Sequence, residues 1–398
     1  MAMSLKDDFF KHQAQTTPHP LAMEISHAKG CYIYDITGKA HLDFVAGVSA
    51  CTLGHGHPKV IEAIKTQAEK YLHVMVYGEY IQEPAVKFTK LLSQHLPESL
   101  STTYLTNSGT EAIEGAIKLA KRVTGRSQII SANNAYHGNT MGSLSIMGFE
   151  ERKNVFRPLM PDVSFIEFND EKDLEKITHK TAGVVLETIQ GGAGFIQPKN
   201  DYLQKVRKRC NETGAQLILD EIQPGFGRTG KLFGFENYNC VPDILALGKG
   251  MAGGMPVGAF VSSYEKMKLL QDKPKLGHIT TFGGHPVIAA AALATLEELT
   301  QTNLIAETLE KEKLFRKLLK HPQISEVRGK GLMLAAMVKT PEIATEVILK
   351  CKEKGLILFW LLFEGKAIRI TPPLTISNSE IEEGCSILLE VLNSIDSK

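Results

Sequence analysis

The middle of the chain carries seven short runs rich in β-branched and aromatic residues, and most of them are continuously apolar rather than alternating. Strands that are buried on both faces have this pattern, because helices cover a parallel sheet on its two sides. The pattern therefore predicts a mostly parallel sheet of seven strands. The runs occupy residues 103–106, 128–131, 164–168, 183–187, 216–220, 244–247 and 258–262.

Helical patterns separate many of these runs. Residues 111–124 place their apolar side chains on one stripe, and Gly125 follows as a stop signal. Residues 202–213 are charged and amphipathic, and Gly214 follows them. Alternation of strands and helices predicts an α/β fold in which helices flank the sheet.

The two ends of the chain have a different pattern. Residues 32–44 contain two alternating strand-like runs joined by Thr37-Gly38, which predicts a hairpin. Residues 291–320 form one long helical pattern. After it come a strand-like stretch at 329–337, a helix near 341–354 and a second strand pair around Glu364-Gly365.

These patterns predict two domains. Residues 46–290 are expected to form a large α/β domain, and residues 1–45 and 291–398 a smaller α+β domain built from both chain ends. No internal repeat, low-complexity tract or flexible linker separates them in the sequence. We therefore expect the two domains to pack tightly.

The composition limits the possible partners and location. The 398 residues are 43% apolar and 22% charged, which is typical of a soluble globular protein. Lys plus Arg number 45 and Asp plus Glu 44, so neither nucleic acid nor a membrane surface is expected as a partner. The N-terminus is polar and charged, so no signal peptide is expected. The most apolar run, residues 356–363, is too short to cross a bilayer and predicts a buried strand. Six cysteines without a CxxC pair indicate reduced thiols in the cytoplasm.

A first pattern that could carry chemistry is Asn107-Ser108-Gly109-Thr110-Glu111, between a predicted strand and a predicted helix. Ser108 and Glu111 fit the S-x-x-E capping box. The free N–H groups and the positive dipole end of the helix suit a phosphate. A plain capped helix is the alternative.

A second pattern spans residues 216–230. Asp220 and Glu221 end an apolar strand, and open α/β sheets bind ligands at that end. The string at 225–231 nearly matches a nucleotide-binding P-loop, but Leu232 stands where a Ser or Thr would hold magnesium. The acidic strand end would also repel a triphosphate, so we discount a nucleotide.

A third pattern contains Gly248, Gly250 and Gly253, which match G-x-G-x-x-G after a strand. This match leaves an NAD-dependent dehydrogenase open, although Pro256 disfavours the helix that such a site needs. The single Lys249 between glycines at a strand end could be a nucleophile, or it could be a solvated loop lysine.

Further signals are weaker. Thr280 and Thr281 lead a glycine-rich turn that could contact a phosphate, and Tyr136-His137-Gly138 supplies an aromatic ring. His55 and His57 lack a third ligand, so no metal site is expected. A phosphate cradle, an acid at a strand end, a nucleophilic lysine and an aromatic platform are together what pyridoxal 5′-phosphate requires.

The chain resembles the class III, or ω-, aminotransferases, a fold-type-I pyridoxal-phosphate family, over nearly its whole length. Its motifs as a whole are similar to those of the acetylornithine and ornithine branch of this family. The motifs that carry the resemblance are YIYDITGKAHLDFVAGVSACTLGHGHPKV, TNSGTEAIEGAIKLAK, AYHGNTMGS, LILDEIQPGFGRTGKLFGFE, PDILALGKGMAGGMPVGA, TTFGGHP and IRITPPL.

The resemblance implies a role for each matching position. Lys249 binds the cofactor aldehyde covalently and then moves the proton at the substrate carbon, and Asp220 pairs with the pyridinium nitrogen. Arg369 binds a substrate carboxylate in a bidentate pair. Thr281 reaches the phosphate of a neighbouring subunit, which implies a homodimer. The other cofactor-binding positions are Ser108, Gly109, Thr110, Tyr136, His137, Glu187, Ile222 and Gln223.

The implied function is transfer of an amino group from an ω-amine or amino acid to a 2-oxo acid such as 2-oxoglutarate or pyruvate. An aminomutase, racemase or decarboxylase would share the cofactor site, and a non-catalytic protein that keeps the cofactor is a further alternative.

Three positions depart from the acetylornithine and ornithine pattern: Asn139 replaces an arginine that binds the donor carboxylate, Gly192 replaces a gating glutamate, and Thr188 replaces a proline. Either the donor lacks that carboxylate and is a bulky apolar compound or an amine, or another cation binds it; Arg152 and Lys153 are nearby in sequence.

Overall fold

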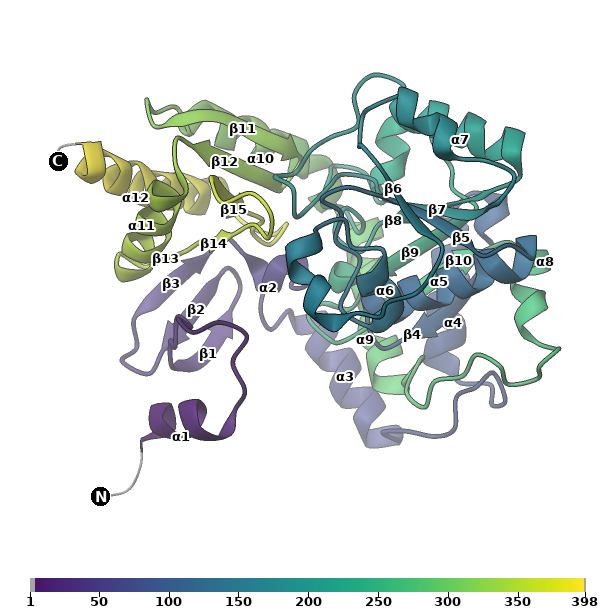
Figure 1. Ribbon diagram of the computed structural model, residues 1–398. Coiled ribbons are helices and arrows are strands. Elements are labelled where there is room, and N and C mark those ends of the chain that lie inside the picture. Colours follow the sequence, from purple (N-terminus) through teal and green to yellow (C-terminus); the bar gives the residue numbers. More distant parts are fainter. Residues whose placement is uncertain (1–3, 397–398) are drawn as a thin grey trace.

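The computed structural model describes residues 4–396. In this part of the chain one sheet has seven strands and two smaller sheets have four each. Figure 1 shows the large sheet with its helices as one body, and the small sheets beside it together with both ends of the chain.

The large sheet has the strand order β4-β10-β9-β8-β7-β5-β6. Neighbouring strands from β9 to β6 are parallel, whereas β10 is antiparallel to both β9 and β4. The predicted mostly parallel seven-stranded sheet is therefore confirmed. Its strands are β4 (Thr102–Thr106), β5 (Gln128–Ala132), β6 (Val163–Ile166), β7 (Thr181–Glu187), β8 (Gln216–Asp220), β9 (Ile244–Gly248) and β10 (Gly258–Ser262).

The central strands are apolar throughout because both of their faces are covered. In β9, Ile244 and Ala246 belong to the cluster that includes helix α5 (Gly109–Thr124), whereas Leu245 and Leu247 belong to a second cluster on the opposite face. Successive side chains of a strand point to opposite faces, so a strand covered on both sides needs apolar residues at every position.

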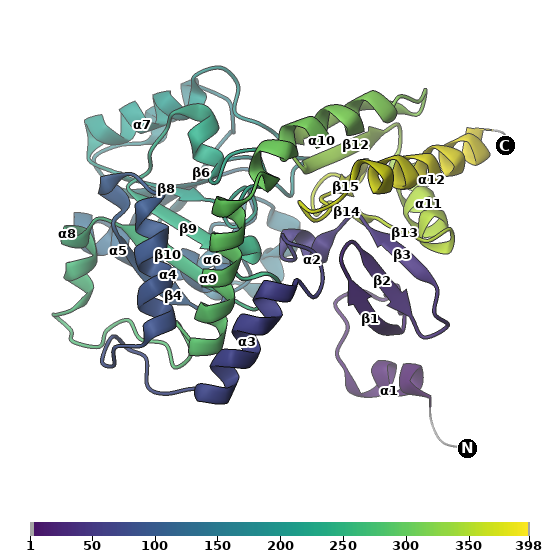
Figure 2. The ribbon, with the colours of Figure 1, turned by 180° about the vertical axis from the view of Figure 1, so that it is seen from behind.

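Helices α3 (Pro58–Lys70) and α4 (Glu83–Gln94) both pack against α9 (Pro286–Gln301), and all three contribute to the second cluster. Figure 2 shows them in front of the sheet when the molecule is seen from behind. Helix α7 (Tyr202–Thr213) packs against β8 and has the predicted bounds.

The two small sheets combine residues from both chain ends. The first has the order β1-β2-β3-β13, formed by Ile25–Lys29, Tyr32–Asp35, Ala40–Asp43 and Leu356–Ile357. The second has the order β11-β12-β15-β14, formed by Ile324–Lys330, Met333–Val338, Ala367–Ile370 and Phe359–Trp360. The hairpin around Thr37-Gly38 and the strand pair around Glu364-Gly365 are both present. The division at residues 45/46 and 290/291 stays a prediction.

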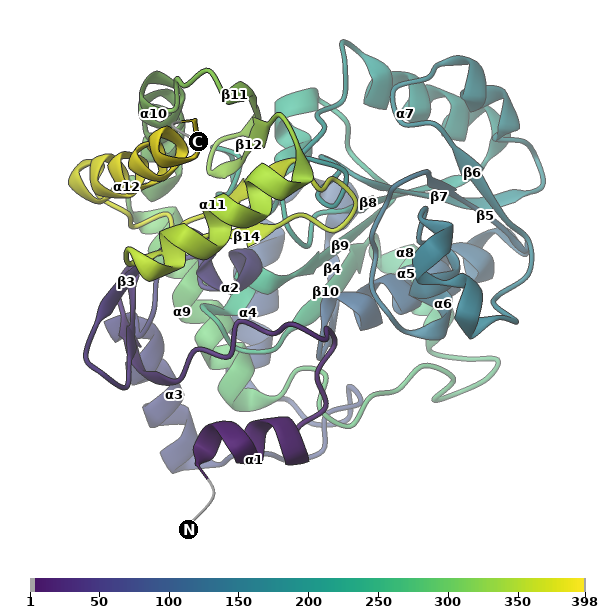
Figure 3. The ribbon, with the colours of Figure 1, turned by 60° about the vertical axis from the view of Figure 1, so that its left-hand side comes forward.

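The remaining helices are shorter or lie outside the large sheet. Figure 3 shows α1 (Leu5–His12) apart from the sheets, and none of its residues is buried. The others are α2 (Ala46–Ser49), α6 (Met141–Ser145), α8 (Tyr264–Met267), α10 (Leu304–Leu318), α11 (Pro341–Glu353) and α12 (Asn378–Asp396). Single 3₁₀ turns are η1 (Glu98–Leu100), η2 (Glu150–Arg152), η3 (Asn154–Phe156), η4 (Lys172–Lys176), η5 (Gly234–Tyr238), η6 (Lys249–Ala252) and η7 (Lys268–Leu270).

Two predicted elements were wrong in extent. The helical pattern at 291–320 is interrupted between α9 and α10, because Thr302 adopts an extended backbone and its hydroxyl bonds back to the Glu298 carbonyl, as hydroxyl side chains at helix ends do. The apolar run at 356–363 is not one buried strand. Its first part pairs with β3 and its second with β15, so the chain crosses between two sheets, and Phe359 is 39% exposed.

A third difference concerns the stretch at 329–337. It contains a turn between β11 and β12, and β11 begins at Ile324. The exposed, charged residues of β11 hid this strand from the hydrophobic pattern. Among residues 4–396, no helix combines the length and the hydrophobicity that crossing a bilayer requires.

The close contact of α5 with β10 generates a stability prediction. A Cβ atom at Gly115 would lie 2.3 Å from Cε1 of Phe260. Overpacking costs roughly 1–3 kcal/mol, which outweighs the gain of about 1 kcal/mol from alanine in a helix. Gly115→Ala is therefore expected to lower the free energy of unfolding, measured by urea titration. In the background of Phe260→Leu the same change should cost less; equal costs in both backgrounds would contradict the contact.

Candidate active site

The predicted acids and the predicted lysine meet at one edge of the large sheet. Glu187 and Asp220 are the last residues of the neighbouring strands β7 and β8 and are paired in register, and Lys249 directly follows β9. The carboxyl ends of parallel strands are where open α/β sheets bind ligands. A cavity of about 450 Å³ lies there. It is lined by Val48, Gly109, Thr110, Tyr136, His137, Gly138, Asn139, Glu187, Gly192, Asp220, Ile222, Gln223, Pro224, Lys249, Phe359, Trp360, Leu362 and Arg369.

The carboxylate of Asp220 is buried and held from two sides. His137 Nδ1 lies 2.7 Å from Oδ2, and the backbone N–H of Ile222 donates to Oδ1 over 3.0 Å. Nε2 of His137 is buried without a hydrogen-bond partner in the described part of the chain. Because both oxygens of Asp220 are fixed by donors, its position relative to the cavity is defined before any ligand binds.

Glu187 is a second buried acid beside Asp220. Its oxygens accept hydrogen bonds from the backbone N–H groups of Gly191 (2.9 Å) and Tyr136 (3.2 Å). Burial, with the nearby Asp220 charge, raises the pKa of Glu187 to about 7, against the lowering influence of His137. Glu187 thus ties two loops of the cavity wall together.

Glu221, which follows Asp220, faces away from the cavity. It accepts hydrogen bonds from the Thr188 hydroxyl and from the backbone N–H groups of Gly234 and Phe235. Burial raises the pKa of Glu221 to about 7. The hydroxyl of Thr188, one of the three departures from the family pattern, is therefore used inside the protein, next to the site rather than in it.

Lys249 borders the cavity in a strained backbone conformation, with φ of +42°. Left-handed backbone at a residue other than glycine is uncommon and concentrates at functional sites. Burial lowers the pKa of the Lys249 amine; the Asp220 charge opposes this shift, and the Arg369 charge adds to it. The amine is thus more readily neutral than that of an exposed lysine.

Arg369, on β15, brings a buried guanidinium to the other side of the cavity. Its Nε and Nη1 atoms have no hydrogen-bond partner in residues 4–396, and its guanidinium carbon lies 5.5 Å from the centre of the Phe195 ring. Burial lowers the pKa of Arg369 to about 10. A buried cation with free donors is suited to a carboxylate ligand, which guanidinium binds through two parallel hydrogen bonds.

The start of α5 has room for an anion against its backbone. Ser108 caps the helix by accepting from the N–H of Glu111, but the Glu111 carboxylate binds Asn107, so the predicted capping box is only half formed. Gly109 and Thr110 line the cavity, and a Cβ atom at Gly109 would lie 2.8 Å from Ile222 Cδ1, so a side chain there would displace Ile222. Thr110 is held by the hydroxyls of Thr140 and Ser143 at 2.9 and 2.7 Å.

The residues present fit pyridoxal phosphate. The helix start supplies N–H donors for a phosphate. The buried acid with its imidazole partner suits a protonated ring nitrogen, and the amine of lowered pKa suits an aldehyde. The unpartnered Nε2 atom of His137 and the unpartnered N–H groups of Arg369 indicate that the cavity is suited to a polar ligand.

Two predicted residues lie outside the cavity lining. Ser108 acts as the helix cap beside it, and Thr281 is exposed on a separate segment. Val48 also lines the cavity and was not predicted, because its only signal in the sequence is the neighbouring Gly47. Residues 46–49 all have positive φ, which bends this segment against the strand ends.

The two nucleotide-like strings do not form nucleotide sites. Residues 225–230 are buried in tight turns, so no triphosphate could reach their backbone. After Gly248 the chain makes only the 3₁₀ turn η6, whereas a dinucleotide site needs a long helix there.

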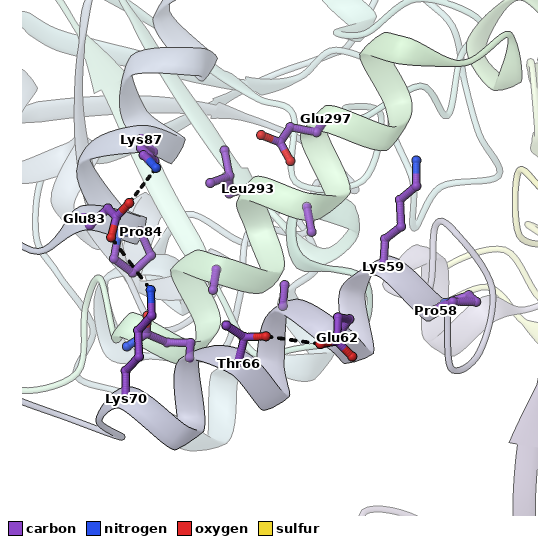
Figure 4. A pocket seen from close by; sticks show the side chains of 14 residues that line it. Pro58, Lys59, Glu62, Thr66, Lys70, Glu83, Pro84, Lys87, Leu293 and Glu297 are labelled. Atoms are coloured by element: carbon purple, nitrogen blue, oxygen red, sulfur yellow. Dashed lines mark hydrogen bonds and ion pairs between the residues drawn. The ribbon is translucent and has the colours of Figure 1, made fainter.

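A second, larger hollow is not the candidate site. About 690 Å³ lies in a groove between α3, α4 and α9 (Figure 4). Its charged side chains are largely paired with one another; for example, Glu83 lies 2.5 Å from Lys87 and 3.9 Å from Lys70. None of the predicted cofactor or substrate residues lines it.

Comparison with known proteins decides the family. The family model for aminotransferase class-III matches residues 13–392. The chain belongs to the class III aminotransferases. Members use pyridoxal phosphate, so this protein is a pyridoxal-phosphate-dependent aminotransferase of fold type I, and its relatives agree with transfer of an amino group to a 2-oxo acid.

Several relatives cover nearly the whole chain. Acetylornithine aminotransferase of Caldanaerobacter subterraneus subsp. tengcongensis is 39% identical over 92% of this chain and 94% of its own length. A [LysW]-aminoadipate semialdehyde/glutamate semialdehyde transaminase of Sulfolobus acidocaldarius is 35% identical over 92% of this chain and 94% of its own. Among solved structures, the ornithine aminotransferase of Toxoplasma gondii ME49 has a TM-score of 0.91 at 30% identity and covers 99% of this chain and 96% of that one.

The lowered pKa of Lys249 generates a prediction about stability and pH. The folded protein disfavours the protonated amine, so Lys249 destabilises the cofactor-free protein at neutral pH, and this penalty disappears as the pH rises to the ordinary lysine pKa of about 10.4. Cofactor-free Lys249→Met is expected to be more stable than the cofactor-free parent at pH 7, by a margin that shrinks toward pH 10. Urea unfolding at several pH values measures the margin.

The exposed Lys90 offers a matched control for that experiment, because it makes no ion pair in the described structure. Lys90→Met should show no pH-dependent gain. A margin for Lys249→Met that is constant from pH 7 to pH 10 would contradict the proposed desolvation of the amine.

Proposed function

We propose that amino transfer takes place in the cavity at the ends of β7, β8 and β9 and that Lys249, Asp220 and Arg369 carry it. The observation that supports this is the meeting, in one cavity, of an amine of lowered pKa, a buried acid–imidazole pair and a guanidinium without a partner. Each of these groups matches one requirement of amino transfer: a proton carrier, a partner for the ring nitrogen and a carboxylate clamp.

Bound pyridoxal phosphate supplies an aldehyde that accepts the amino group and a ring that delocalises the electrons released at the substrate carbon. Lys249 Nζ would bind that aldehyde in the resting enzyme. When a donor amine takes its place, the freed Lys249 Nζ would accept the proton released at the substrate carbon and return it to the carbon that had carried the aldehyde.

Asp220 would hold the protonated ring nitrogen, and His137 keeps the Asp220 carboxylate oriented through the 2.7 Å contact. Gly109, Thr110 and the cap residue Ser108 would hold the phosphate at the start of α5. The remaining predicted cofactor contacts are Tyr136, Glu187, Ile222 and Gln223, all of which line the cavity.

Arg369 would bind the carboxylate of the 2-oxo acid next to the reacting carbon. Its burial and its free Nε and Nη1 donors support this role, because a bidentate pair in a water-poor site fixes the oxo carbon relative to Lys249. Asn139 lines the same cavity and is exposed at its rim.

We also propose a homodimer, supported by apolar side chains exposed on two adjacent segments. Ile81 is 93% exposed and Phe282 is 52% exposed. Tyr80 and Thr280, one from each segment, line a common hollow of about 310 Å³, so the segments lie side by side. Exposed apolar patches of this kind mark interfaces. Thr281 points outward there and would reach the cofactor phosphate of the partner. The six unpaired cysteines support the proposed cytoplasmic location.

Substitution of Lys249 tests the catalytic assignment. Lys249→Ala is expected to keep the fold, and its turnover is expected to fall below about a hundredth of the parental value, because the group that carries the proton in the reaction is removed. The assay mixes the holoenzyme with a panel of amino donors, then follows the cofactor absorbance and the release of free oxo acid. An aminomutase, racemase or decarboxylase would not release a free oxo acid while the cofactor keeps the amino group. Lys90→Ala is the matched control, and a tenth of parental activity in Lys249→Ala would refute the assignment.

Substitution of Ile81 tests the dimer. Burying an isoleucine side chain contributes about 1.5–3 kcal/mol, and a twofold interface loses this contribution twice. Ile81→Arg is therefore expected to shift the protein toward monomers in sedimentation velocity. Val155, which is 77% exposed on a different segment, gives the control Val155→Arg. Equal sedimentation of both variants as dimers would place the interface elsewhere.

A further inference from the structure

The cavity lining offers a second substrate carboxylate no cationic partner. Arg369 is the cation available to a substrate acid, because Lys249 serves the cofactor. The groups around the mouth are uncharged: Asn139, Phe359, Trp360 and Leu362. A cation for the far end of a longer substrate must therefore come from the rim just outside the lining.

The rim is formed where the segment after β14 touches the segment after β7. The N–H of Phe363 donates to the Gly192 carbonyl over 3.0 Å. A Cβ atom at Gly192 would lie 2.7 Å from Phe363 Cδ2, and the Phe363 ring stacks on Phe149 with centres 4.7 Å apart. The ring of Phe363 thus occupies the space that a side chain at position 192 would need.

Arg152 lies on this rim and is anchored at one edge. Its Nη2 donates to the carbonyl of Leu362 over 3.1 Å, and its guanidinium carbon lies 5.7 Å from the centre of the Phe363 ring. Among residues 4–396 no carboxylate pairs with it, since the nearby Glu150 is bound by Arg157 at 3.0 and 2.6 Å. A guanidinium has five N–H donors, so Nε and Nη1 remain for a ligand.

The other candidate cation, Lys153, is already used. Its Nζ donates to the Met147 carbonyl over 2.6 Å and lies 4.1 Å from the centre of the Phe165 ring, and its side chain is 3% exposed. Arg152, by contrast, is exposed at the rim. Its charge is felt at the cavity wall: burial and the Asp220 charge raise the pKa of Tyr136, and the Arg152 charge opposes this rise.

We propose that Arg152 binds the carboxylate at the far end of the substrate, and so selects amino acids and 2-oxo acids that carry an acidic group distant from the reacting carbon. This inference rests on the proposed function, in which Arg369 holds the near end of the oxo acid. The Arg152 guanidinium contacts the Phe363 ring and the Leu362 carbonyl, so it is oriented before a ligand binds. This lowers the entropy cost of forming a bidentate pair with a carboxylate.

Binding of two simple acids to the holoenzyme tests the proposal without turnover. Glutarate carries a carboxylate at each end of a five-carbon chain, and butyrate carries one. The parental protein is expected to bind glutarate about tenfold or more tightly than butyrate, measured by isothermal titration calorimetry, because hydrogen bonds to charged groups are the strong ones. In Arg152→Gln this preference should fall to about twofold or less, and Arg152→Lys should keep part of it as a point charge.

Arg122→Gln is the matched control, with the parental preference expected. Arg122 is exposed and donates to the backbone carbonyls of Leu269 and Asp272, as Arg152 does to that of Leu362, but it lies on α5 and does not line the cavity. A purely structural role of Arg152 would weaken glutarate and butyrate equally. An unchanged preference in Arg152→Gln would overturn the proposal, because another group would then bind the second carboxylate. Equal binding of the two acids by the parental protein would overturn it in favour of substrates that lack a far carboxylate. Amino transfer by the parental enzyme to 2-oxoglutarate and to pyruvate is measured alongside. Absence of transfer to both acceptors would refute the proposed function itself, whereas transfer to either with an unchanged glutarate preference in Arg152→Gln refutes only the role of Arg152.

Discussion

The site depends on the burial of one carboxylate at the end of a central strand. Asp220 is 4% exposed, and an ionised acid in such a place is tolerated only where donors replace its water. Here the imidazole of His137 and the N–H of Ile222 do so. Because β7, β8 and β9 are parallel and adjacent, the same sheet edge that fixes Asp220 also fixes Glu187 and the start of the Lys249 turn. The chemistry of the cavity therefore follows from strand direction as much as from residue type.

The large sheet was predictable because its central strands are covered on both faces, which leaves an unmistakable apolar run at each of them. The candidate residues at the strand ends followed, since the edge where parallel strands end is common to all of them. Elements that depend on partners distant in sequence were not predictable. The run at 356–363 is apolar because its first residues pair with β3 in one sheet and its next residues pair with β15 in another. No local sequence pattern shows that one run contributes to two sheets. Likewise, only the fold separates Arg152 from Lys153, which are consecutive in sequence but lie in solvent and core respectively.

The position of Arg369 depends on hydrogen bonds, made by Arg228 and Thr371, that connect the segments around β12 and β15 to other parts of the chain. Arg228, fully buried, donates to the carbonyls of Leu332 and Pro372, which belong to the segments that flank β12 and β15. Two residues beyond Arg369, the Thr371 N–H and hydroxyl bind the carbonyls of Phe44 and Val45. Burial without a carboxylate lowers the pKa of Arg228 to about 9. Arg228 is held by carbonyl oxygens alone, so it fixes the segments around β12 and β15 at the cost of desolvating its charge. These fixed segments hold Arg369 on the opposite side of the cavity from Lys249.

Two of the three departures from the family pattern, Gly192 and Asn139, line the cavity and are coupled through Arg152. A glutamate at position 192 would collide with the Phe363 ring, and it would also place a carboxylate next to the rim where the Arg152 guanidinium now has no acidic partner. With glycine at 192, Phe363 closes against the backbone and becomes the platform on which Arg152 rests. With asparagine at 139, no second guanidinium repels Arg152 or competes with it for a substrate acid. Relative to the family pattern, glycine at 192 and asparagine at 139 remove one negative and one positive charge from the lining, so its net charge is unchanged, and Arg152 is the cation proposed to act at the rim instead.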